Sequence, residues 1–452
     1  MGGSDSKSQE GKEEYYFNEE ERDRVQLIFC NLSHSQKSFS KENLQHFTEP
    51  VLDHFTSSRL FDWLERPLPG HKIHHDRRHH TDLQHFAAHL AILLKGHVSE
   101  LSSVCLFLAS TSPASVSASD LVHFVGNSLH SYEKLLSAHC TAYQSWIFTS
   151  AQTPRDNKHG LLASSLLSCL LKSAGDLTVG PSETAEKSST LCLSVDQVED
   201  WLSRCHLFHH IFQQVLKGAF QFFSTEPHQI VFEPRLPQVR DTNWSKFGTM
   251  LDFSSVLFLN AALPSEQQTQ WRLVYSNVLH GHSFARFLQC ITSADMPTVL
   301  VIRDKSGRMF GGFASIPWQT GPKFTGDHSC FLFEVGENFN VYKPTGYNQN
   351  FMYLNTQQQT LPNGLGMGGQ FDYFGLWIDQ SFDRGHSKAG ARGCTTYGSP
   401  QLSAHPDFDI DFVEVWAVGR RKNDDGEEED DEYDEEAKVC EEERVECLVV
   451  LD

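Results

Sequence analysis

The chain has 452 residues, of which 39% are hydrophobic and 12% aromatic, so it is long enough to form more than one hydrophobic core. Its formal net charge is −21, but segment 424–446, with fifteen acidic and two basic residues, carries −13 of this and leaves only −8 elsewhere. Phosphate binding requires clustered lysine and arginine, so we expect no nucleic-acid partner. No apolar run approaches the roughly 18 residues of a transmembrane helix.

The first seven residues, Met-Gly-Gly-Ser-Asp-Ser-Lys, match the N-myristoylation pattern. The acyl chain is joined to an unhindered amine, which only a glycine at position 2 supplies, so we predict myristate on Gly2; the alternative is an unmodified flexible segment. One myristoyl chain binds a membrane weakly, with a constant on the order of 10⁴ M⁻¹, and needs a second contact. Acidic neighbours offset Lys7 and Lys12. We therefore expect a membrane-resident protein to provide that contact.

After a flexible segment 1–17, residues 18–226 are predicted to form an all-α domain, because apolar residues recur at helical spacing. Three predicted helix starts share a pattern in which a hydrophobic residue is followed by a serine, with apolar residues four and seven positions after it; the serines are Ser40, Ser117 and Ser194. The pattern resembles the second halves of EF-hand units, yet no loop carries the calcium-binding acids. We therefore predict a degenerate EF-hand-like domain, with loops at 153–160 and 173–190.

From residue 232 to 419 short β-rich runs alternate with turn residues, which predicts a β-sandwich with peripheral helices. The predicted fold class is therefore α+β. Strands are expected at 298–303, 309–315, 331–335, 371–379 and 412–418, and helices at 250–262 and 264–273. Residues 420–452 form a predicted solvated acidic tail, whose apolar end at 445–451 fits a short helix.

Two sequence patterns suggest ligand binding. Residues 364–369 match G-x-G-x-x-G, but a strand rather than a helix is expected to follow, so we predict a tight glycine turn instead of a dinucleotide site. A histidine-rich tract at 71–80, with His85 and His89 nearby, contains pairs four residues apart that could chelate a metal. The tract lacks the glutamate of H-E-x-x-H and includes two arginines, which favours a solvated, pH-responsive loop. We therefore expect no metal and no cofactor.

Two other patterns suggest nucleophilic catalysis. Segment 280–283 (His-Gly-His-Ser) places imidazoles beside a hydroxyl, but no G-x-S-x-G elbow is present. Cys330 and Cys394 are candidate reactive thiols, although no basic setting in the sequence indicates a lowered pKa for Cys394. We expect a protein that is not an enzyme, with a thiol-based redox enzyme as the alternative.

The β-rich half resembles the TLDc domain in the order and spacing of many short motifs. The resemblance covers 232–419, about two fifths of the chain. The segments that carry it include Leu263–Pro264, Trp271–Ser276, His280–Phe284, Gly311–Ser315, Cys330–Phe333, Tyr373–Asp379 and Glu414–Trp416.

This resemblance implies a β-sandwich without an established catalytic site. Members of the family bind the vacuolar proton-pumping ATPase and are linked to resistance to oxidative stress. Members that combine a myristoylatable glycine, an EF-hand-like half and a TLDc half associate with lysosomes and support mTOR kinase signalling. The implied function is therefore a cytoplasmic adaptor, peripheral on the lysosomal membrane, with the mTOR kinase complex and the proton pump as partners; the alternative is an oxidation-resistance protein.

Overall fold

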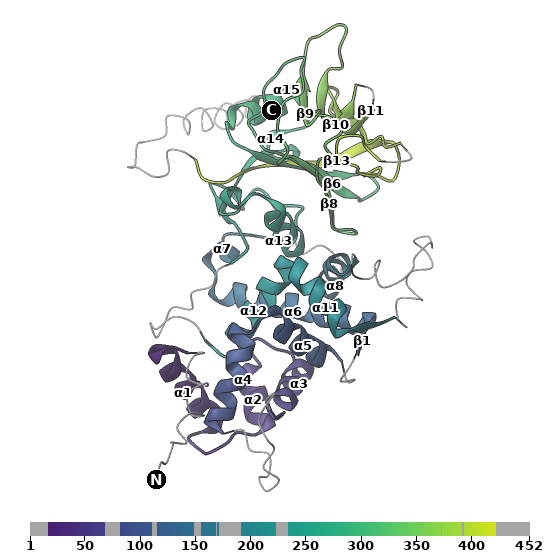
Figure 1. Ribbon diagram of the computed structural model, residues 1–452. Coiled ribbons are helices and arrows are strands. Elements are labelled where there is room, and N and C mark those ends of the chain that lie inside the picture. Colours follow the sequence, from purple (N-terminus) through teal and green to yellow (C-terminus); the bar gives the residue numbers. More distant parts are fainter. Residues whose placement is uncertain are drawn as a thin grey trace, which may run out of the picture.

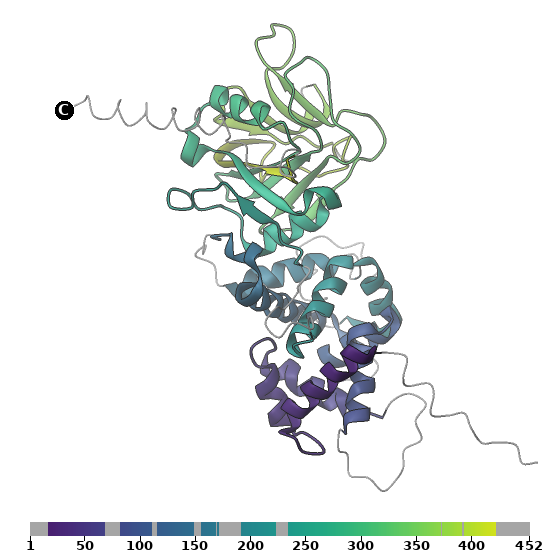
Figure 2. The ribbon, with the colours of Figure 1, turned by 90° about the vertical axis from the view of Figure 1, so that its left-hand side faces the viewer.

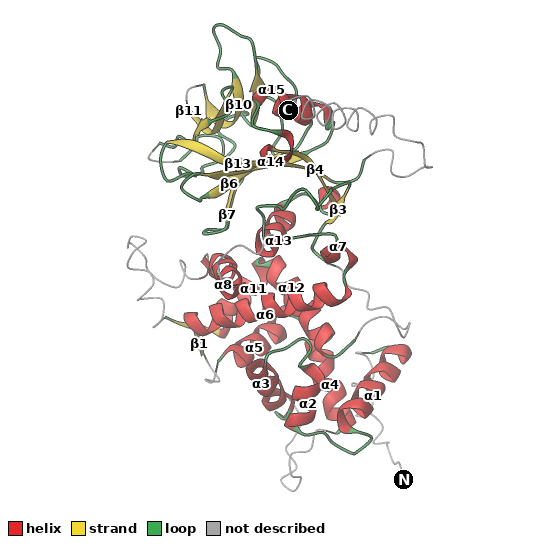
Figure 3. Cartoon of the chain, turned by 180° about the vertical axis from the view of Figure 1, so that it is seen from behind, coloured by secondary structure: helices red, strands yellow, loops and turns green. Residues whose placement is uncertain are grey.

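The computed structural model describes residues 17–67, 82–110, 115–148, 155–168, 170, 191–222, 234–371, 373–390 and 393–421. The predictions for Gly2, the histidine tract at 71–80, the loop at 173–190 and the tail beyond 421 lie outside these residues. Helices make up one half of the molecule and strands the other (Figure 1, Figure 3), which confirms the α+β class. Among the described residues no single helix is both long and apolar enough to span a membrane.

The helical half lies at the N-terminal end of the molecule and contains two short strands, β1 (Ser115–Ser117) and β2 (Cys192–Ser194). Its helices are α1 (Glu19–Ser33), α2 (Lys41–Thr48), α3 (His54–Leu64), α4 (Leu83–Lys95), α5 (Val98–Ala109), α6 (Ala118–His139), α7 (Thr141–Gln144), α8 (Arg155–Leu166), α11 (Val195–Arg204) and α12 (His206–Ala219). Helices α4 and α5 together reach the length and composition of a membrane span, but they are bent by 106° at the break between them.

The three predicted helix starts are confirmed. Ser40, Ser117 and Ser194 precede α2, α6 and α11, and each side chain accepts a hydrogen bond from a backbone amide of the first turn. The hydrophobic residues before two of these serines, Val116 and Leu193, face each other in the antiparallel pair β1–β2, and both are fully buried. In this shared pattern the serine caps the helix that follows. At Ser117 and Ser194 the hydrophobic residue before the serine also forms the strand pair β1–β2.

The predicted loop at 153–160 is wrong over residues 155–160, because α8 begins at Arg155. Two contacts made far from this segment in the sequence hold the helix in place. Lys158 forms an ion pair with Asp252 at 2.9 Å, and Gly160 lies against Gly126 of α6. The local composition of small and polar residues favours a loop, but tertiary packing decides the structure here.

The β-rich half is a sandwich of two sheets that share β13 (Asp407–Val418). The first sheet has the order β8-β7-β6-β5-β13-β4-β3, and all its neighbours are antiparallel except β3 and β4. Its other strands are β3 (Gln238–Arg240), β4 (Gln270–Ser276), β5 (Thr298–Asp304), β6 (Met309–Ala314), β7 (Phe331–Val335) and β8 (Asn340–Tyr342). The second sheet adds β12 (Arg384–His386), β11 (Tyr373–Asp379), β10 (Gly364–Gln370) and β9 (Met352–Asn355), all antiparallel.

Helices α13 (Phe253–Ala262), α14 (Asn277–His280) and α15 (Phe284–Ser293) and the 3-10 turn η1 (Ser265–Gln267) lie around the sandwich. The predicted strands between 298 and 335 are confirmed, and so is the helix within 250–262. The helix predicted at 264–273 is wrong, since η1 is followed by β4. Trp271 and Tyr275 of β4 are both fully buried, but in different hydrophobic clusters.

The first sheet is covered on both faces. In β5, Leu300 and Ile302 belong to the cluster between the two sheets, whereas Val299 and Val301 belong to a cluster that continues into the helical half. Alternate side chains of a strand point to opposite faces, so this division follows directly from the strand geometry. The two halves stack along the long axis of the molecule (Figure 2), and one hydrophobic core runs through their boundary.

Candidate functional site

Four tryptophans meet where the helical half covers the first sheet. Trp146 follows α7, Trp244 lies in the segment before α13, and Trp271 and Trp416 come from β4 and β13. The ring centroid of Trp146 is 5.3 Å from that of Trp416 and 5.8 Å from that of Trp271. The Trp146 indole also donates a hydrogen bond to Pro237 O at 2.8 Å. These contacts fix the helical half against the sheet.

Glu414 of β13 is buried beside these tryptophans. Its carboxylate accepts hydrogen bonds from the Thr249 hydroxyl (2.7 Å), the Met250 amide (2.7 Å) and the Trp416 indole (3.0 Å). Burial raises the pKa of Glu414 to about 7, although these three donors and Arg303 act in the opposite direction. Thr249 also forms a backbone bridge to Phe148 of the helical half. Glu414 therefore holds the segment that connects the two halves.

The two candidate thiols lie near one another in the sandwich core. Cys330 and Cys394 are both buried, and both lie close to Tyr397. The Cys330 sulfur is 3.1 Å from the Ser315 hydroxyl, and burial raises the pKa of this thiol. A nucleophilic or redox-active cysteine needs an accessible thiolate. The structure brings the predicted residues together in a setting that disfavours that chemistry.

The histidines of segment 280–283 have partners other than the neighbouring serine. His280 Nδ1 accepts a hydrogen bond from the Ser276 amide at 3.0 Å. His282 Nε2 lies 3.2 Å from a carboxylate oxygen of Asp383. The Tyr275 hydroxyl donates to Gly281 O at 2.6 Å. These contacts hold the link between β4 and α15 and do not form a nucleophile–base pair.

The glycine run 364–369 is strand β10 rather than the predicted turn. Two of its glycines allow close approach, as predicted: a Cβ on Gly366 would lie 2.5 Å from the Phe374 ring, and one on Gly369, whose φ is +80°, would lie 2.0 Å from Tyr373 O. Strand β11, not a helix, follows the run, so the environment of a dinucleotide site is missing.

His85 and His89 share a face of α4, with ring centroids 4.3 Å apart. One ring nitrogen of each contacts a backbone oxygen: His85 Nε2 lies 2.8 Å from Leu64 O, and His89 Nδ1 lies 2.9 Å from His85 O. Burial against Trp63 lowers the pKa of His89 to about 4. Within the described residues, the group of three potential metal ligands that does come together is His130, Glu133 and His159.

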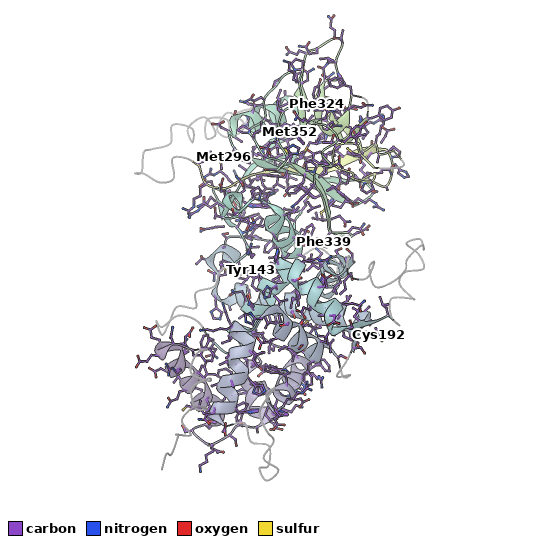
Figure 4. The ribbon with its side chains drawn as sticks, in the orientation of Figure 1. Tyr143, Cys192, Met296, Phe324, Phe339 and Met352 are labelled. Carbon is purple, nitrogen blue, oxygen red and sulfur yellow. The ribbon has the colours of Figure 1, made fainter. Side chains whose placement is uncertain are left out.

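Three exposed aromatic residues, which we call the aromatic end, lie on the second sheet and its loops: Tyr347 (79% exposed), Tyr373 (63%) and Phe371 (37%). Phe371 stacks on Phe324, with centroids 5.4 Å apart, and Figure 4 shows Phe324 in the part of the molecule remote from the helical half. The loop that carries Tyr347 is tied to β10, because Asn350 donates to Gly369 O at 2.7 Å. Aromatic side chains are enriched at protein interfaces, so this end is a candidate contact surface.

The sandwich and its motifs define a TLDc domain, and residues 245–419 match the model of that family. The chain is 34% identical over 438 residues to mTOR-associated protein MEAK7 of Gallus gallus, covering 93% of this chain and 90% of the relative. It is 37% identical over 412 residues to mTOR-associated protein MEAK7 of Homo sapiens, covering 88% and 86%. The chain therefore belongs to the family of mTOR-associated protein MEAK7.

A different relative aligns with part of the chain alone. Oxidation resistance protein 1 of Mus musculus is 35% identical over 147 residues, which cover 32% of this chain and 16% of that protein. The resemblance to the TLDc family, first seen in the sequence motifs, is thus confirmed.

Sequence reasoning missed Glu414 and the His130–Glu133–His159 group. The spacing of His130 and Glu133 on a predicted helix was a usable signal, since residues three apart lie on one helix face. Nothing in the sequence connects them to His159, which lies on a helix that was predicted as a loop.

Proposed function

We propose that this protein is a non-catalytic adaptor that associates with the mTOR kinase complex on the cytoplasmic face of the lysosomal membrane. It binds the vacuolar proton-pumping ATPase through its TLDc domain and is held on the membrane by myristate on Gly2. The mTOR association is supported by the names of relatives that align over most of the chain. The burial of both candidate thiols, Cys330 and Cys394, supports the non-catalytic assignment over a thiol-based redox enzyme.

The observation that carries the pump-binding proposal is the aromatic end. Tyr347 and Tyr373 are more than half exposed and stand among the exposed large hydrophobic residues, whereas tyrosine as a residue type is intermediate in burial. They belong to the TLDc domain, and strands β9, β10 and β11 lie at the end of the molecule opposite the helical half (Figure 1). A partner can therefore contact this end without displacing the helices. Together with one weakly binding acyl chain, such a contact gives a stable attachment.

The contact is tested with full-length protein in which Tyr347→Ala and Tyr373→Ala are combined. Pump subunits recovered with the protein from detergent-solubilised lysosomal membranes should fall about tenfold or more, as for loss of a binding hot spot. The matched control is Phe55→Ala, which removes an exposed aromatic ring from the helical half (49% exposed) and should leave recovery unchanged. Undiminished recovery with the double variant would exclude this end as the contact.

The membrane attachment is tested separately with Gly2→Ala. The variant cannot be acylated and should move from the lysosomal pellet to the soluble fraction, while its capture of detergent-solubilised pump stays unchanged. Equal pelleting of the variant and the unaltered protein would refute the two-contact attachment.

A further inference from the structure

Three side chains with metal-binding atoms converge where α6 crosses α8. His130 and Glu133 lie one turn apart on α6, and His159 lies on α8. The two helices pack against each other where Gly126 faces Gly160: a Cβ built on Gly126 would stand 3.8 Å from Gly160 Cα. As a result, one ligand atom from each of the three side chains lies within 4.8 Å of the other two.

His159 lacks a hydrogen-bonding partner in this group. The residue is buried, with only 6% of its surface exposed, yet neither ring nitrogen makes a hydrogen bond. Nε2 lies 3.2 Å from Oε2 of Glu133, but the two atoms are not aligned for a hydrogen bond. A buried polar atom without a partner destabilises the folded state, because it has lost its hydrogen bonds to water. The unpaired nitrogen therefore indicates a missing partner between His159 and Glu133.

The 3.2 Å separation fits a metal ion in that position. Zinc binds histidine nitrogen and carboxylate oxygen at about 2.0–2.2 Å, and two such ligands at the tetrahedral angle lie about 3.3–3.4 Å apart. Two imidazoles and one carboxylate suit zinc, whereas calcium and magnesium prefer oxygen ligands. The ligand atom of His130 lies within 4.8 Å of those of His159 and Glu133, so rotation of a side chain can bring it to the same spacing.

The surroundings prepare this position for a cation. The Tyr143 hydroxyl donates to Oε1 of Glu133 at 2.9 Å, which orients the carboxylate. The Phe253 ring stacks on His159 with centroids 6.0 Å apart and shields the site from water. The neighbouring Lys158 is neutralised by its ion pair with Asp252. Figure 4 places Tyr143 at the boundary between the helical half and the TLDc domain.

We propose that His130, Glu133 and His159 bind a zinc ion that fastens α6 to α8 at the boundary with the TLDc domain. Three protein ligands leave the fourth tetrahedral position to a water molecule. The ion ties the long helix of the helical half to the short helix that packs on α13. This role is independent of the mTOR and pump contacts.

The test uses the full-length protein with any affinity tag removed. The protein is stripped with a chelator, reloaded with zinc chloride and desalted, and its zinc content is measured by plasma mass spectrometry. The unaltered protein should retain about one zinc ion per chain, and His159→Gln and Glu133→Gln should each retain less than about a tenth of that. His123→Gln, which replaces an exposed histidine of α6, is the matched control and should retain the zinc.

A fourth variant separates this site from the histidine-rich tract. It carries alanine in place of four tract histidines and should keep its zinc; they are His74, His75, His79 and His80. Zinc should also raise the unfolding temperature of the unaltered protein and of this variant, by mass action, but not that of Glu133→Gln. Failure of the unaltered protein to retain zinc, or loss of the zinc in the tract variant, would overturn the proposal even if His159→Gln does not fold.

Discussion

Replacing Glu414 by glutamine tests how one buried carboxyl group sets the stability of the boundary between the two halves. Burial raises its pKa from 4.5 to about 7. Between these values the folded protein keeps a proton that the unfolded chain has released, so the contribution of Glu414 to the free energy of unfolding falls as the pH rises. Each pKa unit corresponds to about 1.4 kcal/mol, which gives a loss of about 3 kcal/mol across this interval.

The sign of the effect follows from the direction of the pKa shift. The contribution of Glu414 is complete below about pH 4.5, declines up to about pH 7 and is constant above that. Glutamine has a similar shape and does not ionise, so Glu414→Gln lacks this decline. The free energy of unfolding of the unaltered protein minus that of the variant should therefore fall by about 3 kcal/mol between about pH 4.5 and pH 8.

The assay is urea unfolding at a series of pH values, followed by tryptophan fluorescence, because the Trp416 indole donates directly to Glu414. Subtracting the variant from the unaltered protein cancels the titration of other groups. Glu266→Gln replaces an exposed glutamate near the same sheet and should show no such pH-dependent difference. If the free energy of unfolding of the unaltered protein minus that of Glu414→Gln stays constant or rises with pH, the pKa of Glu414 is not raised by burial.

Three further predictions concern packing, capping and thiol exposure. Gly366→Ala should reduce the free energy of unfolding by about 2 kcal/mol or more, because its Cβ meets an aromatic ring at 2.5 Å, whereas Gly321→Ala has open space and should change little in the same urea titration. Ser194→Ala should cost about 1 kcal/mol by removing the N-cap of α11; no change in the urea midpoint would exclude a capping role. A brief thiol-labelling pulse read by peptide mass spectrometry should modify the exposed Cys192 and spare Cys330, whose pKa is raised by burial; equal labelling would contradict that burial.

The helical half covers an apolar face of the first sheet, and so it stabilises the TLDc domain in addition to any role in binding. Val299 and Val301 of β5 lie in the hydrophobic cluster that continues into the helices. Without the helices, that face of the first sheet would expose apolar side chains and tryptophan rings to water, which costs about 25 cal/mol for each Å². The full chain is therefore the appropriate material for experiments on the TLDc domain.

The sequence by itself determined the features that depend on near neighbours. Ser40, Ser117 and Ser194 cap helices because a serine hydroxyl reaches amides two or three residues ahead. The apolar run at 298–303 forms a strand, and the motif order from 263 to 416 identifies the TLDc domain. For the helix caps and the strand, residues a few positions apart carry the physical cause; the domain is recognised from the order of such short motifs along the chain.

Only the tertiary structure decided the features that depend on distant partners. Residues 155–160 are helical because they pack on α6 and pair with Asp252, although their composition favours a loop. Glu414 is buried because donors some 165 positions earlier in the chain surround it. His159 meets His130 and Glu133 because α8 packs against α6. Burial and convergence of side chains depend on which surfaces the folded chain brings together, and local spacing does not record that.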